Sequence, residues 1–267
     1  MPDSTVGIVI IGRNEGDRLS KCLASVLPTA QAAMYVDSGS TDGSVEMAQT
    51  MGANVLPLDL GSPLTAARAR NAGYERLLSL HPKIRFVMFV DGDCEVVDGW
   101  MHDARDYLEA SPECAAVCGR RRERHPERSV YKKLCDIEWA APLGDALSCG
   151  GDALFRTKAF TQVSGFRDGL IAGEEPELCL RLRGAGWHIH RLALVFRSIK
   201  TNTYQVTPRS NLFQRNTTGD ALISAMPLRM RCFRSSLDVT RMCRKKVRAI
   251  LEKAHSIKLS QEPCLGV

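Results

Sequence analysis

Apolar runs alternate with amphipathic helical patterns between residues 6 and 90. The run VGIVIIG has the length and composition of a buried strand. The segment after it, RLSKCLASVL, places Leu19, Cys22, Leu23 and Val26 at the i, i+3, i+4 and i+7 spacing of one helix face. The same reasoning predicts a strand at 32–37, a helix that stops at Gly52, a strand at 54–60, a helix at 64–80 and a strand at 84–90.

This alternation predicts an α/β fold. Strands that alternate with helices form a mainly parallel sheet with right-handed crossovers and helices on its faces, and ligands bind outside the carboxyl ends of the strands. Three polar clusters, GRNEG (12–16), DSGSTDG (37–43) and DGD (91–93), follow predicted strands. We therefore expect a binding site at that edge of the sheet.

The DGD cluster carries the first candidate chemistry. In extended chain, alternate side chains face the same way, so Asp91 and Asp93 point together and Gly92 permits close backbone approach between them. Two such carboxylates suit a hard divalent cation that also binds phosphate oxygens. The alternative is a turn in which an aspartate caps the next helix.

A second acidic cluster lies in AGEEPELCLRLRGAGW (172–187). Pro176 and the glutamates beside it suit the first turn of a helix, and Gly184 and Gly186 suit its end. The glutamates can therefore be helix-start carboxylates alone, or part of a reacting site.

Composition indicates a globular protein. The chain has 267 residues, of which 44% are hydrophobic, enough for one large α/β domain or one and a half. The 10 cysteines are scattered without C-x-x-C pairs, which favours reduced thiols in the cytoplasm. We expect neither an export signal nor a membrane span.

The same spacing argument predicts no zinc site. Cys114 and Cys118 are expected to face one side of a strand as core thiols, and His188 and His190 to be ordinary strand histidines.

The net charge of +6 is unevenly distributed. Residues 197–267 contain 14 Lys and Arg against 4 Asp and Glu, a balance of +10, while residues 1–196 contain 22 against 26, a balance of −4. A folded domain of this charge argues against nucleic-acid binding. The basic end is either a solvated, poorly ordered or helical segment, or a contact to an anionic membrane at its inner face.

Six motifs, in order and at suitable spacing, resemble the inverting family 2 glycosyltransferases of GT-A fold over roughly residues 6–195. They are IVIIGRNEGDRLSKCLASV, VDSGSTDGS, ARARNAG, FVDGDCEV, GGDALFRTKAF and GEEPELCLRLRGAGW. The resemblance implies a GT-A domain over 1–196, with a nucleotide-binding half at about 1–98 and an acceptor half at about 99–196. It also implies a UDP-, GDP- or dTDP-sugar donor, a sugar or lipid-linked acceptor, and Mg²⁺ or Mn²⁺, as in polysaccharide or glycolipid synthesis.

The resemblance further assigns site residues. Asp93 would ligate the metal, with Asp91 on the metal or the ribose, and Glu175, second of the pair opened by Glu174, would deprotonate the acceptor. The family more often has Asp at position 175, and often a second acidic residue where Ser38 stands. The donor site would be lined by Asn14, Glu15, Asp37, Ser38, Arg70, Asn71, Asp91, Gly92, Gly150, Gly151 and Asp152.

Purely structural roles remain open for several of these: Asp37 as a turn residue, Arg70 as a surface salt-bridge partner, and the glycines as turn formers only. Other functions also remain open. A nucleotidyltransferase would want a basic, Gly-rich phosphate loop, and a dinucleotide-binding oxidoreductase would want G-x-G-x-x-G, which GIVIIGRNEG lacks. A catalytically impaired, GT-A-like interaction protein is the alternative outside enzymes.

The likeness stops near Val195, where the family commonly has a metal-binding histidine that this chain lacks. The segment 197–267 is thus a divergent acceptor or membrane-surface element, or a tail that no longer encodes the ancestral structure, as a shifted reading frame would produce. The second explanation, which is slightly preferred, predicts a loosely packed tail, weak metal affinity and low turnover.

Overall fold

The computed structural model describes residues 3–123, 126–128, 133, 136–137 and 141–198. Its elements are β1 (Asp3–Gly12), α1 (Asp17–Val26), η1 (Leu27–Thr29), β2 (Ala30–Asp37), α2 (Ser44–Thr50), β3 (Asn54–Pro57), α3 (Ala66–Leu80), β4 (Phe86–Asp91), β5 (Cys94–Glu95), α4 (Trp100–Ala110), β6 (Cys114–Glu123), η2 (Pro126–Arg128), β7 (Gly144–Asp145), β8 (Ala153–Arg156), α6 (Thr157–Gln162), α7 (Glu174–Gly184) and β9 (His188–Ser198).

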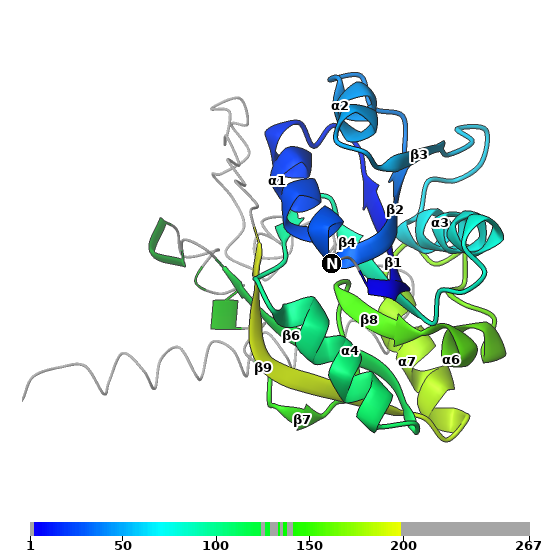
Figure 1. Cartoon of the computed structure of the whole chain (residues 1–267), viewed down its shortest axis with the longest axis vertical. Coiled ribbons are helices and arrows are strands. Elements are labelled where there is room, and N and C mark those ends of the chain that lie inside the picture. The colour runs from blue at the N-terminus through cyan, green and yellow to red at the C-terminus, as the bar shows by residue number, and fades with distance from the viewer. Residues whose placement is uncertain (1–2, 124–125, 129–132, 134–135, 138–140, 199–267) are drawn as a thin grey trace, which may run out of the picture. The chain divides into compact units, whose positions relative to one another are not determined.

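In the described part of the chain these strands form one nine-stranded sheet, with the order β3-β2-β1-β4-β8-β6-β9-β5 and β7 paired to β9 (Figure 1). Strands β3, β2, β1 and β4 are mutually parallel, as are β6 and β9. Strand β8 runs antiparallel to β4 and β6, and β5 and β7 run antiparallel to β9. The predicted mainly parallel α/β sheet with flanking helices is confirmed.

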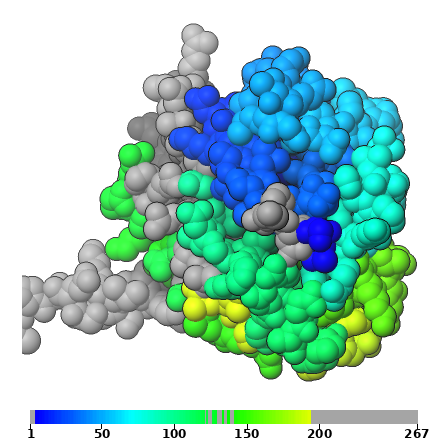
Figure 2. Space-filling view, in the orientation of Figure 1, coloured from blue at the N-terminus to red at the C-terminus, as the bar shows by residue number. Residues whose placement is uncertain are grey.

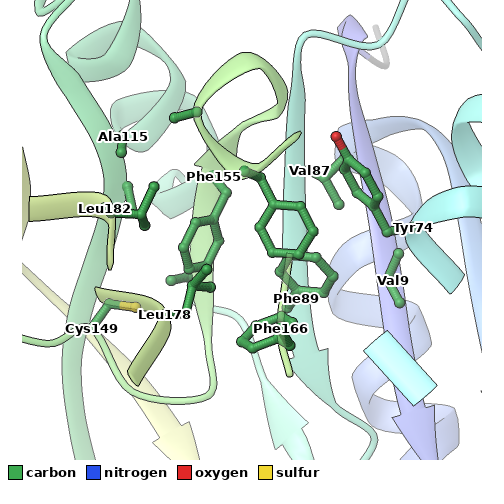
Figure 3. Packing of buried hydrophobic residues seen from close by; sticks show 14 of the residues in the cluster. Val9, Tyr74, Val87, Phe89, Ala115, Cys149, Phe155, Phe166, Leu178 and Leu182 are labelled. Carbon is green, nitrogen blue, oxygen red and sulfur yellow. The ribbon is translucent and has the colours of Figure 1, made fainter. Parts of the chain in front are cut away.

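Helices cover both faces of the sheet because its strands bury alternate side chains on opposite sides. In β4, Phe86, Met88 and Val90 pack with α1, α2 and α4, whereas Val87 and Phe89 pack with α3, α6 and α7. Figure 3 shows the second of these clusters, in which Phe89, Phe155 and Phe166 meet between the sheet and the helices. Asp91 continues the Val87–Phe89 face, so it points toward the side of α3 and α7.

Close packing of α3 on the sheet depends on Gly73. A Cβ atom at this position would lie 2.5 Å from Val9 Cγ1 and 2.7 Å from Val36 Cγ2. Any side chain would therefore push the helix outward. Arg70 lies one turn earlier on the same buried face, so the contact at Gly73 brings its side chain to the sheet.

The predicted orientation of Cys114 and Cys118 is wrong. Cys114 packs with the α1 and α4 cluster, but Cys118 packs with the α3 and α7 cluster. A register irregularity between Cys114 and Ala116 breaks the alternation, as an extra residue in a bulge does. The histidines do lie on a strand, β9, where Ile189 is buried between them and His190 Nδ1 lies 2.9 Å from the Tyr107 hydroxyl.

The six cysteines that the structure describes are free and buried, consistent with the reduced thiols predicted. Within the described ranges, no helix combines the length and the apolar character needed to cross a bilayer.

The proposed division near residue 98 stays a prediction. In Figure 2 the blue-to-cyan and green-to-yellow parts of the chain lie directly against each other, and the pairing of β4 with β8 joins them in one sheet. The predicted basic segment 197–267 lies outside the described residues, apart from Arg197 and Ser198 at the end of β9.

Candidate active site

Three strands deliver polar residues to one edge of the sheet. Gly12 at the end of β1 pairs with Asp37 of β2, and Ile11 pairs with Asp91 of β4. Asp37 and Asp91 therefore flank the carboxyl end of β1, in the place where ligands bind in such sheets.

The DGD segment forms a group of potential cation ligands. One ligand atom each from Asp91, Asp93 and Cys94 lie within 4.8 Å of one another. Asp91 is buried and Asp93 is half-buried, and the Gly92 amide donates to the Ile11 carbonyl oxygen at 2.9 Å, which ties the segment to β1. Two close carboxylates fit the preference of Mg²⁺ or Mn²⁺ for oxygen ligands, whereas a buried thiol adds little for a hard cation.

Arg70 joins this segment to the acidic cluster of α7. Its guanidinium, 1% exposed, donates from Nη2 to Asp91 Oδ1 and from Nη1 to Glu174 Oε1, each at 2.8 Å. The alternative of a surface salt bridge for Arg70 is therefore wrong, because both ion pairs are formed by a buried guanidinium. Its Nε atom has no hydrogen-bond partner among the described residues.

The three glutamates at the start of α7 have different partners. Glu174 binds Arg70, and Glu177 pairs with Arg181 at 2.7 Å and with Arg167 at 2.8 Å. Glu175 turns inward, and its Oε1 accepts hydrogen bonds from the Cys149 amide at 2.5 Å and the Cys179 thiol at 3.0 Å. No described residue donates to its second oxygen, Oε2. The helix start predicted here is confirmed, and among these three Glu175 alone lies against thiols.

The thiols beside Glu175 are held in the neutral form. Burial raises the pKa of Cys149, and its contact with Cys179 raises it further. At Cys179 the hydrogen bond from Cys149 lowers the pKa, but burial and the charge of Glu175 outweigh it and the net shift is upward. Burial also raises the pKa of Cys118, which lies near the same carboxylate, to about 12.

The GGD loop packs against the Arg70–Asp91 pair. Gly150 has φ +87°, and a Cβ atom at Gly151 would lie 3.2 Å from Arg70 Nη2 and 3.4 Å from Asp91 Oδ2. Asp152 Oδ1 accepts a hydrogen bond from the Asp91 amide at 3.2 Å. The structure therefore brings the three GGD residues to the carboxylates, and the role of Gly151 is close packing as well as turning.

The residues after β1 and β2 mostly bind one another. Asn14, with φ 54°, donates its amide to Ser40 Oγ and accepts from the Thr41 amide at Oδ1, at 2.9 and 2.8 Å. Glu15 pairs with Arg18 at 2.9 Å. These contacts close the loop that follows β2 over the end of β1.

Asp37 is engaged in the turn after β2. Its Oδ2 accepts from the Gly39 and Ser40 amides, each at 2.9 Å, and its Oδ1 accepts from the Tyr35 hydroxyl at 3.1 Å. The turn role left open for Asp37 is present. Ser38 lies beside it, half-buried, with its amide donating to the Gly12 carbonyl oxygen. Contact of Asp37 or Ser38 with a nucleoside stays a prediction.

Asn71 holds a loop. Its Nδ2 donates to the Phe166 carbonyl at 2.7 Å and to Asp168 Oδ1 at 2.6 Å, and its Oδ1 accepts from the Phe166 amide at 3.0 Å. These three bonds fasten the segment that leads into α7. The Asn71 amide is thus directed at protein, and its predicted place in the donor site stays a prediction.

Sequence reasoning missed the thiols beside Glu175. Cys179 could have been found, because it follows Glu175 by four residues and such residues share a helix face. Cys149 carried no such signal, since its contact spans 26 residues from a loop to a helix.

Comparison with known proteins gives the family. Residues 7–161, more than half of the chain, match the family model of glycosyl transferase family 2. No curated protein matches.

Solved structures of similar fold include the mannosyltransferase PcManGT from Pyrobaculum calidifontis in complex with GDP-Man and Mn²⁺, with 17% identity over 76% of this chain and 61% of that chain and a TM-score of 0.56. GalNAc-T7 with UDP, GalNAc and Mn²⁺ is similar at 13% identity over 73% and 44%, with a TM-score of 0.58. Glucosyl-3-phosphoglycerate synthase from Mycobacterium tuberculosis is similar at 18% identity over 82% and 75%, with a TM-score of 0.54.

The chain spans less than two thirds of the mannosyltransferase and of GalNAc-T7, and at these identities the likeness shows the fold. The expected GT-A architecture is thereby confirmed, and the family model adds what fold alone does not give: the chain belongs to glycosyl transferase family 2.

Proposed function

We propose that this chain transfers a sugar from a nucleoside-diphosphate sugar to an acceptor hydroxyl with inversion at the anomeric carbon. The observation that carries the proposal is the connected arrangement of two acidic groups: Asp91 and Asp93 at the end of β4, and Glu174 and Glu175 at the start of α7, joined by the buried guanidinium of Arg70. A displacement needs a base on the acceptor side and positive charge on the leaving-group side, and the two groups suit these roles.

Asp91 and Asp93 would hold the divalent cation. Their oxygens suit Mg²⁺ or Mn²⁺, and the hydrogen bond from Arg70 orients Asp91. A cation bound there would supply positive charge to neutralise the departing nucleoside diphosphate. The titles of PcManGT and GalNAc-T7 name Mn²⁺ together with a nucleotide or nucleotide sugar, which supports a cation of this kind and a UDP- or GDP-sugar among the donors.

Glu175 is the better candidate for the base. Glu174 Oε1 is occupied by the Arg70 guanidinium at 2.8 Å, so this carboxylate is committed to an ion pair. Glu175 is fixed through Oε1 by two donors, and Oε2 receives no hydrogen bond from the described residues, so it is available to accept the proton of an acceptor hydroxyl. The hydroxyl oxygen then attacks the anomeric carbon as the bond to the diphosphate breaks, in a single displacement.

The donor would lie across the ends of β1, β2 and β4. Asn14, Glu15, Asp37 and Ser38 form its nucleoside end, and the loop Gly150–Asp152 lies toward the sugar, with Gly92 between. The Nε–H of Arg70 has no hydrogen-bond partner among the described residues and could donate to a phosphate oxygen. Two further parts of this proposal are a sugar or lipid-linked acceptor, and contact of the basic segment with the inner, cytoplasmic face of the membrane.

Slow hydrolysis of the donor tests the proposal without knowledge of the acceptor. UDP-, GDP- and dTDP-sugars with Mn²⁺ are followed by proton NMR, which distinguishes the anomers of the released sugar. An α-linked donor should give the β-sugar before mutarotation equilibrates it. Initial release of the α-anomer would contradict inversion, and absence of Mn²⁺-dependent turnover with every donor would favour the impaired interaction protein.

A further inference from the structure

Two thiols and a carboxylate form a compact group at the start of α7. One ligand atom each from Cys149, Cys179 and Glu175 lie within 4.8 Å of one another, and all three residues are buried. The two Sγ atoms are 3.6 Å apart, and Cys179 Sγ is 3.0 Å from Glu175 Oε1. This group is separate from the DGD segment, and sugar transfer needs neither of its thiols.

The distances fit a thiophilic cation. Zinc binds thiolate sulfur at about 2.3 Å and carboxylate oxygen at about 2.0 Å, so two sulfurs on one tetrahedral ion lie about 3.8 Å apart, and a sulfur and an oxygen roughly 3.5 Å apart. The observed 3.6 and 3.0 Å differ from these values by a few tenths of an ångström, which small side-chain rotations supply. Two sulfurs also select against Mg²⁺ and Mn²⁺, which prefer oxygen.

The fold holds the ligands in place. Glu175 and Cys179 occupy one face of α7 a turn apart, and the Cys149 amide is bonded to the same carboxylate. Figure 3 shows Cys149 at the border of the apolar cluster that includes Leu178 and Leu182, and an apolar shell of this kind limits solvent at a metal centre.

The loop that carries Cys149 offers a route from solvent to the thiols. Cys149 lies in a loop in which Leu147 is 73% exposed and Gly150 is exposed, so exposed residues flank this buried cysteine in the chain. Local opening of this loop would admit an ion, because exposed loops open at low free-energy cost.

We propose that Cys149, Cys179 and Glu175 bind a thiophilic divalent cation, Zn²⁺, with water at the fourth position. On binding, both thiols release their protons to solvent and each sulfur forms a bond to the ion, while a carboxylate oxygen of Glu175 forms the third. One consequence rests on the proposed function: an ion that occupies Glu175 removes the base, so Zn²⁺ inhibits sugar transfer at a site distinct from the DGD carboxylates.

Cadmium alone is the probe, because Cd²⁺ bound to thiolate absorbs in the ultraviolet in proportion to the number of sulfurs. The reduced, metal-free full chain is titrated with Cd²⁺ and its melting temperature is followed in parallel. We expect one tight site with the intensity of two thiolates and a rise in melting temperature. Cys149→Ser and Cys179→Ser should each weaken binding at least tenfold and remove half of the absorbance or more.

Two cysteine variants serve as controls. Cys114→Ser removes another buried strand thiol that belongs to neither ligand group, and it should bind Cd²⁺ as the wild type does. Cys94→Ser removes the thiol of the DGD segment and should also leave the two-thiolate absorbance intact. Loss of the signal in Cys94→Ser, or its persistence in both Cys149→Ser and Cys179→Ser, would overturn the proposal.

A variant that keeps both thiols covers the case in which the serine variants do not fold. Glu175→Gln should retain the two-thiolate absorbance at saturation, and its affinity for Cd²⁺ should be weaker than that of the wild type by at least about tenfold. An unchanged affinity would rule out the three-ligand site. The binding result stands whether or not the chain transfers sugar. Where transfer is measurable, Zn²⁺ added over saturating Mn²⁺ should inhibit the wild type at least tenfold more strongly than Cys149→Ser, each relative to its own rate without Zn²⁺.

Discussion

Two ligand groups of opposite chemical character lie at the ends of one chain of contacts. The group at the end of β4 consists of two carboxylates and one thiol, and the group at the start of α7 consists of one carboxylate and two thiols. Arg70 connects the first to Glu174, the neighbour of Glu175 in the second. We call them the strand group (Asp91, Asp93, Cys94) and the helix group (Cys149, Glu175, Cys179).

The difference in ligand atoms between the two groups can separate cation binding from proton transfer. Oxygen ligands suit hard cations better than sulfur ligands do, so under the proposed function Mg²⁺ or Mn²⁺ would bind the strand group and leave the carboxylate of the helix group free to act as the base. The same difference makes the helix group vulnerable to soft cations.

The largest expected effect comes from removing the strand group's accessible carboxylate. Asp93→Ala should abolish Mn²⁺-dependent donor binding and lower turnover by at least about 10²-fold, because the cation loses a ligand and the leaving diphosphate its counter-charge. Calorimetric titration of donor with and without Mn²⁺ measures this. Asp98→Ala, an exposed aspartate five residues on, is the matched control and should behave as the wild type.

Removing Arg70, which links the two groups, should give the largest loss in the free energy of unfolding. Arg70→Met removes the guanidinium from the buried Asp91 and the half-buried Glu174, which should lower the free energy of unfolding by about 3 kcal/mol or more. Denaturant unfolding measures it, and Mn²⁺ should recover part of the loss by compensating Asp91. The exposed Arg85–Glu109 pair provides the control, since Arg85→Met should cost less than about 1 kcal/mol. Equal losses in the two variants would refute a structural role for the Arg70 link.

The helix group is tested by exchanging carboxylate for amide. Glu175→Gln keeps the size of the side chain but cannot accept the proton, so turnover should fall by about 10²-fold with donor binding nearly unchanged. Glu174→Gln should lower turnover less and stability more, because it weakens the pair with Arg70. If Glu174→Gln is instead the variant that loses turnover, the base is the first member of the pair.

The smallest effect concerns the loop that leads into α7. Asn71→Ala removes three hydrogen bonds and should destabilise the protein by about 1–2 kcal/mol, measured by chemical unfolding. If Asn71→Ala lowers the free energy of donor binding by more than it lowers the free energy of unfolding, Asn71 lies in the donor pocket, as the family resemblance implies.

Much of the fold was predictable because its first half obeys local rules. Leu19, Cys22, Leu23 and Val26 mark the buried face of α1, and the continuous apolar run before Asp91 marks β4. The antiparallel strand β8 and the bulge near Cys114 were not predictable, because strand pairing and register depend on contacts far apart in the sequence.

The candidate site was predictable where one motif supplies several neighbours, as Asp91 and Asp93 do. It was not predictable where partners come from distant segments: the Arg70–Glu174 pair spans 104 residues, and the turn contacts of Asp37 depend on how its loop folds. The residue types indicated which chemistry was available. The packing of α3 and α7 on the sheet determines that Glu174 contacts Arg70 and that Glu175 contacts the thiols.

The most direct test of the central claim is a thermal-shift screen of UDP, GDP and dTDP, each with and without Mn²⁺, on the wild type and Asp93→Ala. A ligand at about 100 times its dissociation constant adds roughly 2.7 kcal/mol to stability, which corresponds to a rise on the order of 5–10 °C in melting temperature. The account predicts such a rise for at least one nucleotide in the wild type, only with Mn²⁺, and its absence in Asp93→Ala. An equal rise without Mn²⁺, or an equal rise in Asp93→Ala, would contradict it.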